Sequence, residues 1–105
     1  MDLAALQQQL RDFVQARDWS RYHTPKNLVM AMSVEMAELV EHFQWLTPEE
    51  SQALASDDAR RDLVEQEMAD VMLYMLQLAD VMQVDIEAAI QRKLVLNAQK
   101  HPPLP

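Results

Sequence analysis

The sequence contains no glycine and no cysteine among its 105 residues. Without glycine, strand-and-turn architectures are disfavoured, and a glycine-rich phosphate-binding loop or dinucleotide fingerprint is excluded. Any phosphate binding must therefore use side chains and a bound metal ion. Without cysteine there are no disulfides and no thiolate metal sites, which is compatible with a reducing cytosol.

Positive charge and long apolar runs are also scarce. Nine lysine and arginine residues stand against seventeen aspartate and glutamate residues, for a net charge of −8, which disfavours binding to nucleic acid through its phosphates. Charges interrupt every apolar stretch before it reaches the roughly 18 residues of a membrane span. The first residues lack the basic and apolar segments of a signal peptide. We therefore expect a cytoplasmic protein with neither a membrane nor a nucleic-acid partner.

Helical periodicity and helix caps are present along most of the chain. Asp2 is a candidate N-cap for the first helix, and the pairs Thr24-Pro25 and Thr47-Pro48 are typical helix starts. Main helices are predicted over residues 2–17, 25–45, 58–82 and 86–100, with a short helix over 48–55. The first helix has a single apolar face, which we interpret as plain packing.

These elements predict one all-α domain over residues 1–105, ordered from about 2 to 100, with a short proline-rich tail over 101–105. An antiparallel four-helix bundle is the economical arrangement of four such helices. The helices over 25–45 and 58–82 are apolar on nearly all sides, and the chain contains eight methionines. Because 105 residues cannot cover that much apolar surface, we expect a homo-oligomer.

Two acidic pairs interrupt these apolar helices, Glu35-x-x-Glu38 and Glu67-x-x-Asp70. Residues three apart lie on one helix face. Burying a bare carboxylate costs several kcal/mol, so four together need a counter-charge, and Mg²⁺ with its preference for oxygen ligands is the natural one. The alternative is a non-catalytic helical interaction module whose carboxylates are solvated surface charges.

Facing carboxylates in a helical bundle also suggest a di-iron or di-manganese oxidase site, which uses Glu-x-x-His motifs. Here His42 follows Glu38 by four residues, and no histidine stands near the second pair. An all-oxygen set suits Mg²⁺ or Mn²⁺ better than redox iron. The chemistry most consistent with it is phosphoryl or nucleotidyl displacement, in which a carboxylate orients or deprotonates the attacking water.

Two other segments have alternative interpretations. Trp19, Tyr22 and His23 cluster in a loop that is either a hydrophobic lid over the core or a stacking platform for a base, and the residues alone favour the lid. In the last helix a polar stripe includes Lys93 and Asn97. Such a stripe is usually solvated, but in an acidic protein it could meet phosphate oxygens.

The acidic motif, with 28 residues between Glu38 and Glu67, resembles the metal motif of the MazG-like all-α nucleoside triphosphate pyrophosphohydrolases. The likeness covers nearly the whole chain, and its flanking segments resemble the dCTP pyrophosphatase branch. Those segments are Arg17-Asp18-Trp19, Tyr22-His23-x-Pro25-Lys26-Asn27-Leu28, Phe43-Gln44-Trp45 and Lys93-x-x-x-Asn97. The chain departs from the branch at His42, where an apolar residue is usual.

The resemblance implies hydrolysis of a nucleoside triphosphate, such as dCTP or a modified pyrimidine deoxynucleotide, to a monophosphate and pyrophosphate. It implies a dimer or tetramer in which neighbouring subunits complete the site, and it favours the stacking platform for the aromatic loop. The resemblance implies Mg²⁺, or alternatively Mn²⁺, as the metal ion, and its implied ligands are Glu35, Glu38, Glu67 and Asp70. One of these four would orient or deprotonate the attacking water. The implied substrate-binding residues are Trp19, His23, Asn27, Trp45 and Tyr74 for base and sugar, and Lys26, Lys93 and Asn97 for the phosphates.

Overall fold

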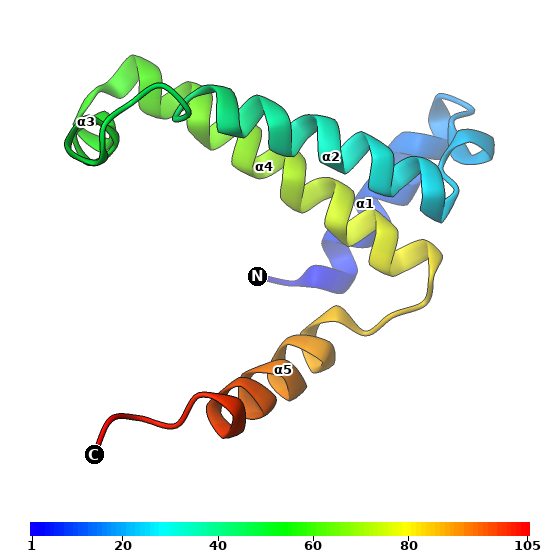
Figure 1. Ribbon diagram of the computed structural model, residues 1–105. Helices are drawn as coiled ribbons and strands as arrows, with labels where there is room; N and C mark the ends of the chain where they lie inside the picture. Colours follow the sequence, from blue (N-terminus) through cyan, green and yellow to red (C-terminus); the bar gives the residue numbers. More distant parts are fainter.

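The computed structural model describes residues 1–105, which form helices and no strands (Figure 1). The all-α prediction is confirmed. The α-helices are α1 (Leu3–Ala16), α2 (Pro25–Glu41), α3 (Pro48–Ala53), α4 (Asp58–Val81) and α5 (Ile86–Lys100), and the two short 3₁₀ helices are η1 (Ser20–Tyr22) and η2 (Leu54–Ser56). No helix combines the length and the apolar character that crossing a bilayer requires.

Side-chain caps explain where these helices begin. At each α-helix start, a side-chain oxygen accepts a hydrogen bond from a backbone N–H three residues later, and the five capping residues are Asp2, Thr24, Thr47, Asp57 and Asp85. Such bonds satisfy N–H groups that have no partner inside the helix. At α3 the cap is reciprocal, because the N–H of Thr47 also donates to the Glu50 carboxylate (2.9 Å). This backbone hydrogen bond lowers the pKa of Glu50.

The second helix is shorter than predicted, since α2 ends at Glu41 rather than near Trp45. The N–H groups of Phe43 and Gln44 both donate to the carbonyl of Val40 at 2.9 Å, so the chain tightens into a turn. Just downstream, Thr47 and Pro48 exclude a helix that continues through residue 47. Thr47 is extended, with a ψ of 163°, because it caps α3 and precedes a proline, and a residue before proline is driven out of the helical region.

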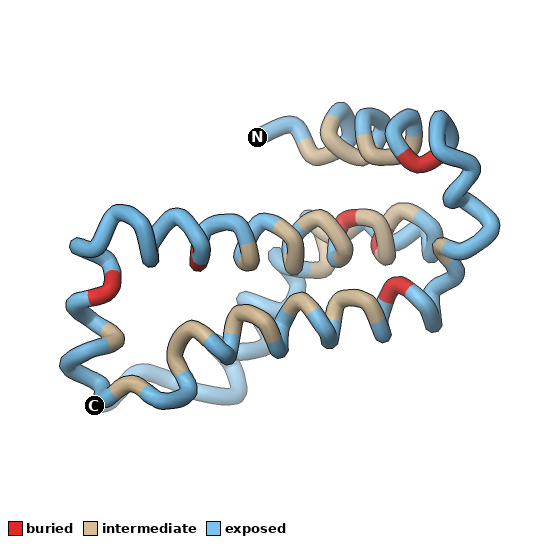
Figure 2. Tube along the Cα trace, turned by 90° about the horizontal axis from the view of Figure 1, so that it is seen from above, coloured by how far each residue is buried: buried red, intermediate tan, exposed pale blue.

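Three helices make up the packed part of the chain. Helices α2 and α4 run antiparallel and side by side, and α1 packs against α4 (Figure 1). The buried residues are few and lie on these helices and on η2, as Figure 2 shows in red. They are Val14, Leu28, Leu54, Val64, Leu76 and Ala79.

The fourth long helix, α5, extends away from the other three and hardly contacts them (Figure 1). The radius of gyration is 17.0 Å, whereas a compact domain of this length has about 13 Å. The middle of α4, although apolar on nearly all sides, is buried on one face only, since Met68 and Met72 are about half exposed. Within a single chain, therefore, only three of the four long helices pack together. The four-helix bundle and the homo-oligomer stay predictions.

We predict that Leu28→Ala lowers the free energy of unfolding by about 2–5 kcal/mol, because it removes buried methyl groups and leaves a cavity. Leu28 is 1% exposed, the least of any large side chain. Denaturant titration measures the change. Leu104→Ala is the matched control, because that side chain is 94% exposed, and its effect should stay within about 0.5 kcal/mol. Equal stability of the two variants would contradict the assignment of Leu28 to the core.

Candidate metal and nucleotide site

Three carboxylates meet where α2 and α4 run side by side. One oxygen of each of Glu35, Glu38 and Glu67 lies within 4.8 Å of the other two, and all three side chains are partly buried. Two come from adjacent turns of α2 and the third from α4, as helical spacing predicted. Asp70, one turn after Glu67, lies outside this group, but its charge still acts on Glu35 and Glu67.

Burial and like charge disfavour the ionised form of this carboxylate cluster. Desolvation is the main cause that raises the pKa of Glu35 to about 7, followed by the hydrogen bond and the charge of Glu38. Desolvation and then Glu38 also raise the pKa of Glu67, while the charge of His42 acts in the opposite direction. Without a counter-charge, the cluster therefore retains a proton close to neutral pH.

Two carboxylate oxygens of the cluster have no hydrogen-bond partner. The Oε2 atoms of Glu35 and Glu67 are both buried and accept no hydrogen bond. A buried, unsatisfied polar atom costs about 1–3 kcal/mol, and more when it is charged, so such atoms call for an explanation. Unpaired oxygens from facing helices are a donor set that a hard divalent cation satisfies, and the residues present therefore fit Mg²⁺ or Mn²⁺.

A cleft of about 440 Å³ adjoins the carboxylates, within the usual range of small-molecule sites. Glu35 and Asp70 line it together with three of the predicted substrate-binding residues, Trp19, His23 and Tyr74. The structure thus brings acidic and aromatic residues to one cavity. The remaining lining residues are Leu10, Phe13, Val14, Leu73 and Gln77.

Helix α1 contributes more to this cleft than its sequence indicated. Its apolar face was interpreted as plain packing, yet Leu10 and Phe13 line the cleft. The ring of Phe13 lies edge-on to Trp19, with centroids 5.9 Å apart, an arrangement that aromatic pairs favour. The only available signal was the position of an aromatic residue six residues before Trp19, and periodicity cannot distinguish a core face from a cleft wall.

Five predicted substrate-binding residues lie elsewhere in the single chain. Lys26 and Asn27 are exposed in the first turn of α2, and the Asn27 side-chain amide donates to the carbonyl of Tyr22 (2.9 Å), which ties the aromatic loop to α2. Trp45 is 87% exposed beyond the end of α2. Lys93 and Asn97 are exposed on the distant α5. The structure does not bring these residues into the cleft of their own chain.

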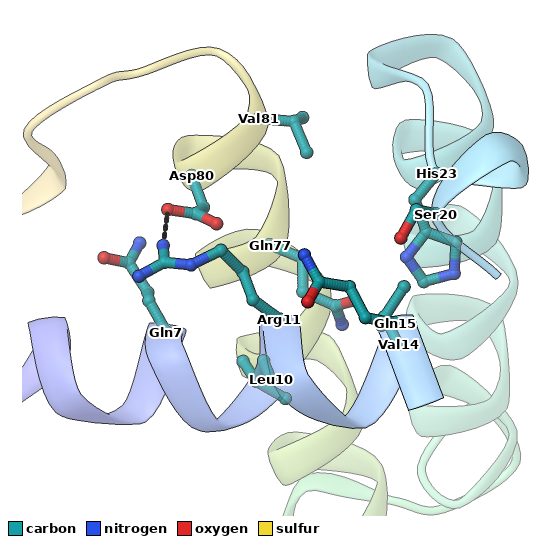
Figure 3. A pocket seen from close by; sticks show the side chains of 10 residues that line it. All are labelled: Gln7, Leu10, Arg11, Val14, Gln15, Ser20, His23, Gln77, Asp80 and Val81. Carbon is teal, nitrogen blue, oxygen red and sulfur yellow. Dashed lines mark hydrogen bonds and ion pairs between the residues drawn. The ribbon is translucent and has the colours of Figure 1, made fainter. Parts of the chain in front are cut away.

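Polar contacts between α1 and α4 hold the wall of the cleft in place. Figure 3 shows a second, smaller cavity of about 190 Å³, in which Arg11 of α1 forms an ion pair with Asp80 of α4. The side-chain amide of Gln7 donates to the carbonyl of Leu76 (2.9 Å). His23 lines both cavities, so these contacts fix α1 against α4 next to the aromatic loop.

Several known proteins are similar to this chain. Residues 30–103 match the model of the MazG-like family. The chain is 35% identical over 91 residues to dCTP pyrophosphatase 1 of Rattus norvegicus and 34% identical to that of Homo sapiens, and each match covers 87% of this chain and 54% of the relative. The chain thus spans about half the length of these relatives. A crystal structure of a pyrophosphatase from Archaeoglobus fulgidus matches it with a TM-score of 0.90 and 39% identity, over 98% of this chain and 94% of that one.

The family match covers most of the chain and includes both acidic pairs. The solved structure matches nearly the whole chain, including α5. These findings confirm the resemblance that the acidic motif and its flanks indicated. The chain belongs to the MazG-like family.

Proposed function

We propose that this protein is a metal-dependent nucleotide pyrophosphohydrolase. It hydrolyses a nucleoside triphosphate between the α and β phosphates and releases a nucleoside monophosphate and pyrophosphate. The observation that carries the proposal is the convergence of three partly buried carboxylates from α2 and α4 beside a cleft lined by Trp19 and Tyr74. The names of its relatives, a pyrophosphatase and dCTP pyrophosphatases, support it.

The proposed cation ligands are Glu35, Glu38, Glu67 and Asp70, with Mg²⁺ as the ion and Mn²⁺ as the alternative. When bound, such an ion neutralises phosphate charge and makes a coordinated water more acidic. Glu35 and Asp70 line the cleft, so they face the substrate, and one of them accepts the proton of the attacking water.

The base and sugar would bind in the cleft. Trp19 offers a flat face on which a base stacks, a contact worth about 1–3 kcal/mol, and His23 and Tyr74 supply polar atoms at the same cavity. We propose dCTP or a modified pyrimidine deoxynucleotide as the preferred substrate, on the basis of the resemblance and of the relatives' names. Removal of such nucleotides from the cellular pool is the corresponding role.

The phosphate contacts would come from a neighbouring subunit. No lysine or arginine lines the cleft, although a triphosphate carries several negative charges. Lys93 and Asn97 lie on α5, which extends away from the other helices of its chain. Trp45 is exposed just beyond the C-terminal end of α2. In a dimer or tetramer these residues, with Lys26, would complete the site of another copy.

Product analysis tests the proposed reaction. The protein with about millimolar Mg²⁺ should convert at least one nucleoside triphosphate of a full panel into its monophosphate and pyrophosphate. Chromatography of the nucleotides and a pyrophosphate-specific assay identify the products. Release of orthophosphate, or no turnover of any nucleotide, would sink the proposal and favour a non-enzymatic interaction module.

The same assay should show that Glu38→Gln loses nearly all turnover, because a neutral amide cannot replace the central carboxylate of the cluster. Glu41→Gln is the matched control. It makes the same change on the same helix, at an exposed position outside the cluster, and should stay active. Circular dichroism should be alike for the two variants, so that lost activity is not lost folding.

The raised pKa values predict that the metal-free protein becomes less stable as the pH rises. A carboxyl whose folded pKa is about 7 against an ordinary 4.5 stabilises the fold fully below about pH 4.5, and that contribution is lost as the pH rises through about 7. In chelator, the melting temperature should therefore fall between about pH 5.5 and pH 8. Glu35→Gln should reduce the fall, and Mg²⁺ should raise the melting temperature most at the higher pH. An equal fall in the variant would contradict the role of Glu35.

We predict a solution mass that is two or four times the 12.2 kDa of one chain, measured by size-exclusion chromatography with light scattering. Ile90, Leu94 and Val95 of α5 are about half exposed or more, and such a face needs a partner surface. Leu94→Glu should lower the mass and the activity together. Gln99→Glu, on a polar position of the same helix, is the control. A monomeric, fully active native protein would refute the shared site.

A further inference from the structure

The aromatic wall of the cleft, formed by Phe13 and Trp19, is not locked by burial, since the two side chains are 47% and 45% exposed. A turn at the end of α1 places the backbone of Trp19. In this turn Asp18 is left-handed, with a φ of 56°, and the N–H of Trp19 donates to the carbonyl of Val14 (3.0 Å). The turn leaves the orientation of the indole ring to side-chain contacts.

Arg17 supplies such a contact through Phe13. Its guanidinium carbon lies 3.5 Å from the centroid of the Phe13 ring, well within the range of about 6 Å for a cation–π contact. Its Nη1 atom also donates to the carbonyl of Phe13 (3.0 Å), in the last turn of α1, where a cation is favourable. The Phe13 ring in turn meets Trp19 at an angle of 67°. Because Arg17 does not line the cleft, it acts on the wall through Phe13.

We propose that Arg17 is a positioning residue for nucleotide binding, whose guanidinium holds Phe13 and thereby Trp19 in the orientation in which a base stacks. The inference rests on the proposed function and deepens it, because it concerns the base-binding side of the same cleft. A planar guanidinium stacks on an aromatic ring, whereas lysine keeps the charge without the planar group. The competing interpretation is that Arg17 only adds positive charge near a polyanionic substrate.

Tryptophan fluorescence without nucleotide tests the packing. Trp45→Phe leaves Trp19 as the one tryptophan of the chain, so that acrylamide quenching reports the accessibility of its indole. In this background Arg17→Lys and Arg17→Met should both raise the quenching constant, by up to about twofold from a residue that is 45% exposed, because the stack is lost. Arg21→Met is the matched control, since Arg21 lies over the ring of Tyr22 and neither residue lines the cleft. It should leave the constant unchanged.

Steady-state kinetics tests the consequence for binding, in protein that retains Trp45. The substrate is dCTP, or the triphosphate of the panel that the native protein hydrolyses best. Both Arg17 variants should raise KM about threefold to tenfold and change kcat less than about twofold, because base stacking is weakened and the carboxylates are untouched. Inhibition by inorganic tripolyphosphate, which has the phosphate chain without the base, should stay within about twofold of native.

The two measurements separate positioning from charge. A native KM in Arg17→Lys, with weaker tripolyphosphate inhibition in Arg17→Met, would overturn the proposal in favour of a charge effect. Unchanged quenching of Trp19 in both variants, or an equal change in Arg21→Met, would also overturn it. If the native protein hydrolyses a nucleotide and the Arg17 variants match its KM, only this inference fails. If the native protein hydrolyses none, the proposed function fails and takes this inference with it.

Discussion

The structure depends on the contact between α2 and α4, and this contact places like charges from the two helices next to each other. Glu35 and Glu38 of α2 meet Glu67 of α4 along the contact that forms the body of the chain. Desolvation raises the pKa values of Glu35 and Glu67, and two of their oxygens accept no hydrogen bond. Such an arrangement opposes folding unless a proton or a cation neutralises it, so the stability of the α2–α4 pair depends on the charge state of these carboxylates.

Helix α1 and the aromatic loop enclose a cleft beside this charged contact. The ion pair of Arg11 with Asp80 holds α1 on α4, so that Phe13 and Trp19 form one wall of a cleft that opens onto the carboxylates. The cleft therefore offers apolar and aromatic surface on one side and oxygen donors on the other. A nucleotide has the same division, between a flat base and a charged phosphate chain.

Contacts within a single chain do not explain the position of helix α5. It extends from the packed helices (Figure 1), its apolar residues are exposed, and it carries Lys93 and Asn97. The same arrangement accounts for the large radius of gyration and for a cleft that lacks cationic side chains. The proposed packing of a second copy against the first would account for both features.

The sequence and the tertiary structure determined different features of this protein. Caps and periodicity predicted the five helices because both depend on residues within a turn of one another, and i, i+3 spacing placed each acidic pair on one helix face. The sequence did not indicate that α2 would stop at Glu41, that Phe13 would line the cleft, or that α5 would leave the bundle open. It did not place His42 beside Glu67 either. Contacts between helices depend on crossing angles and on turns far along the chain, so only the folded structure decided them.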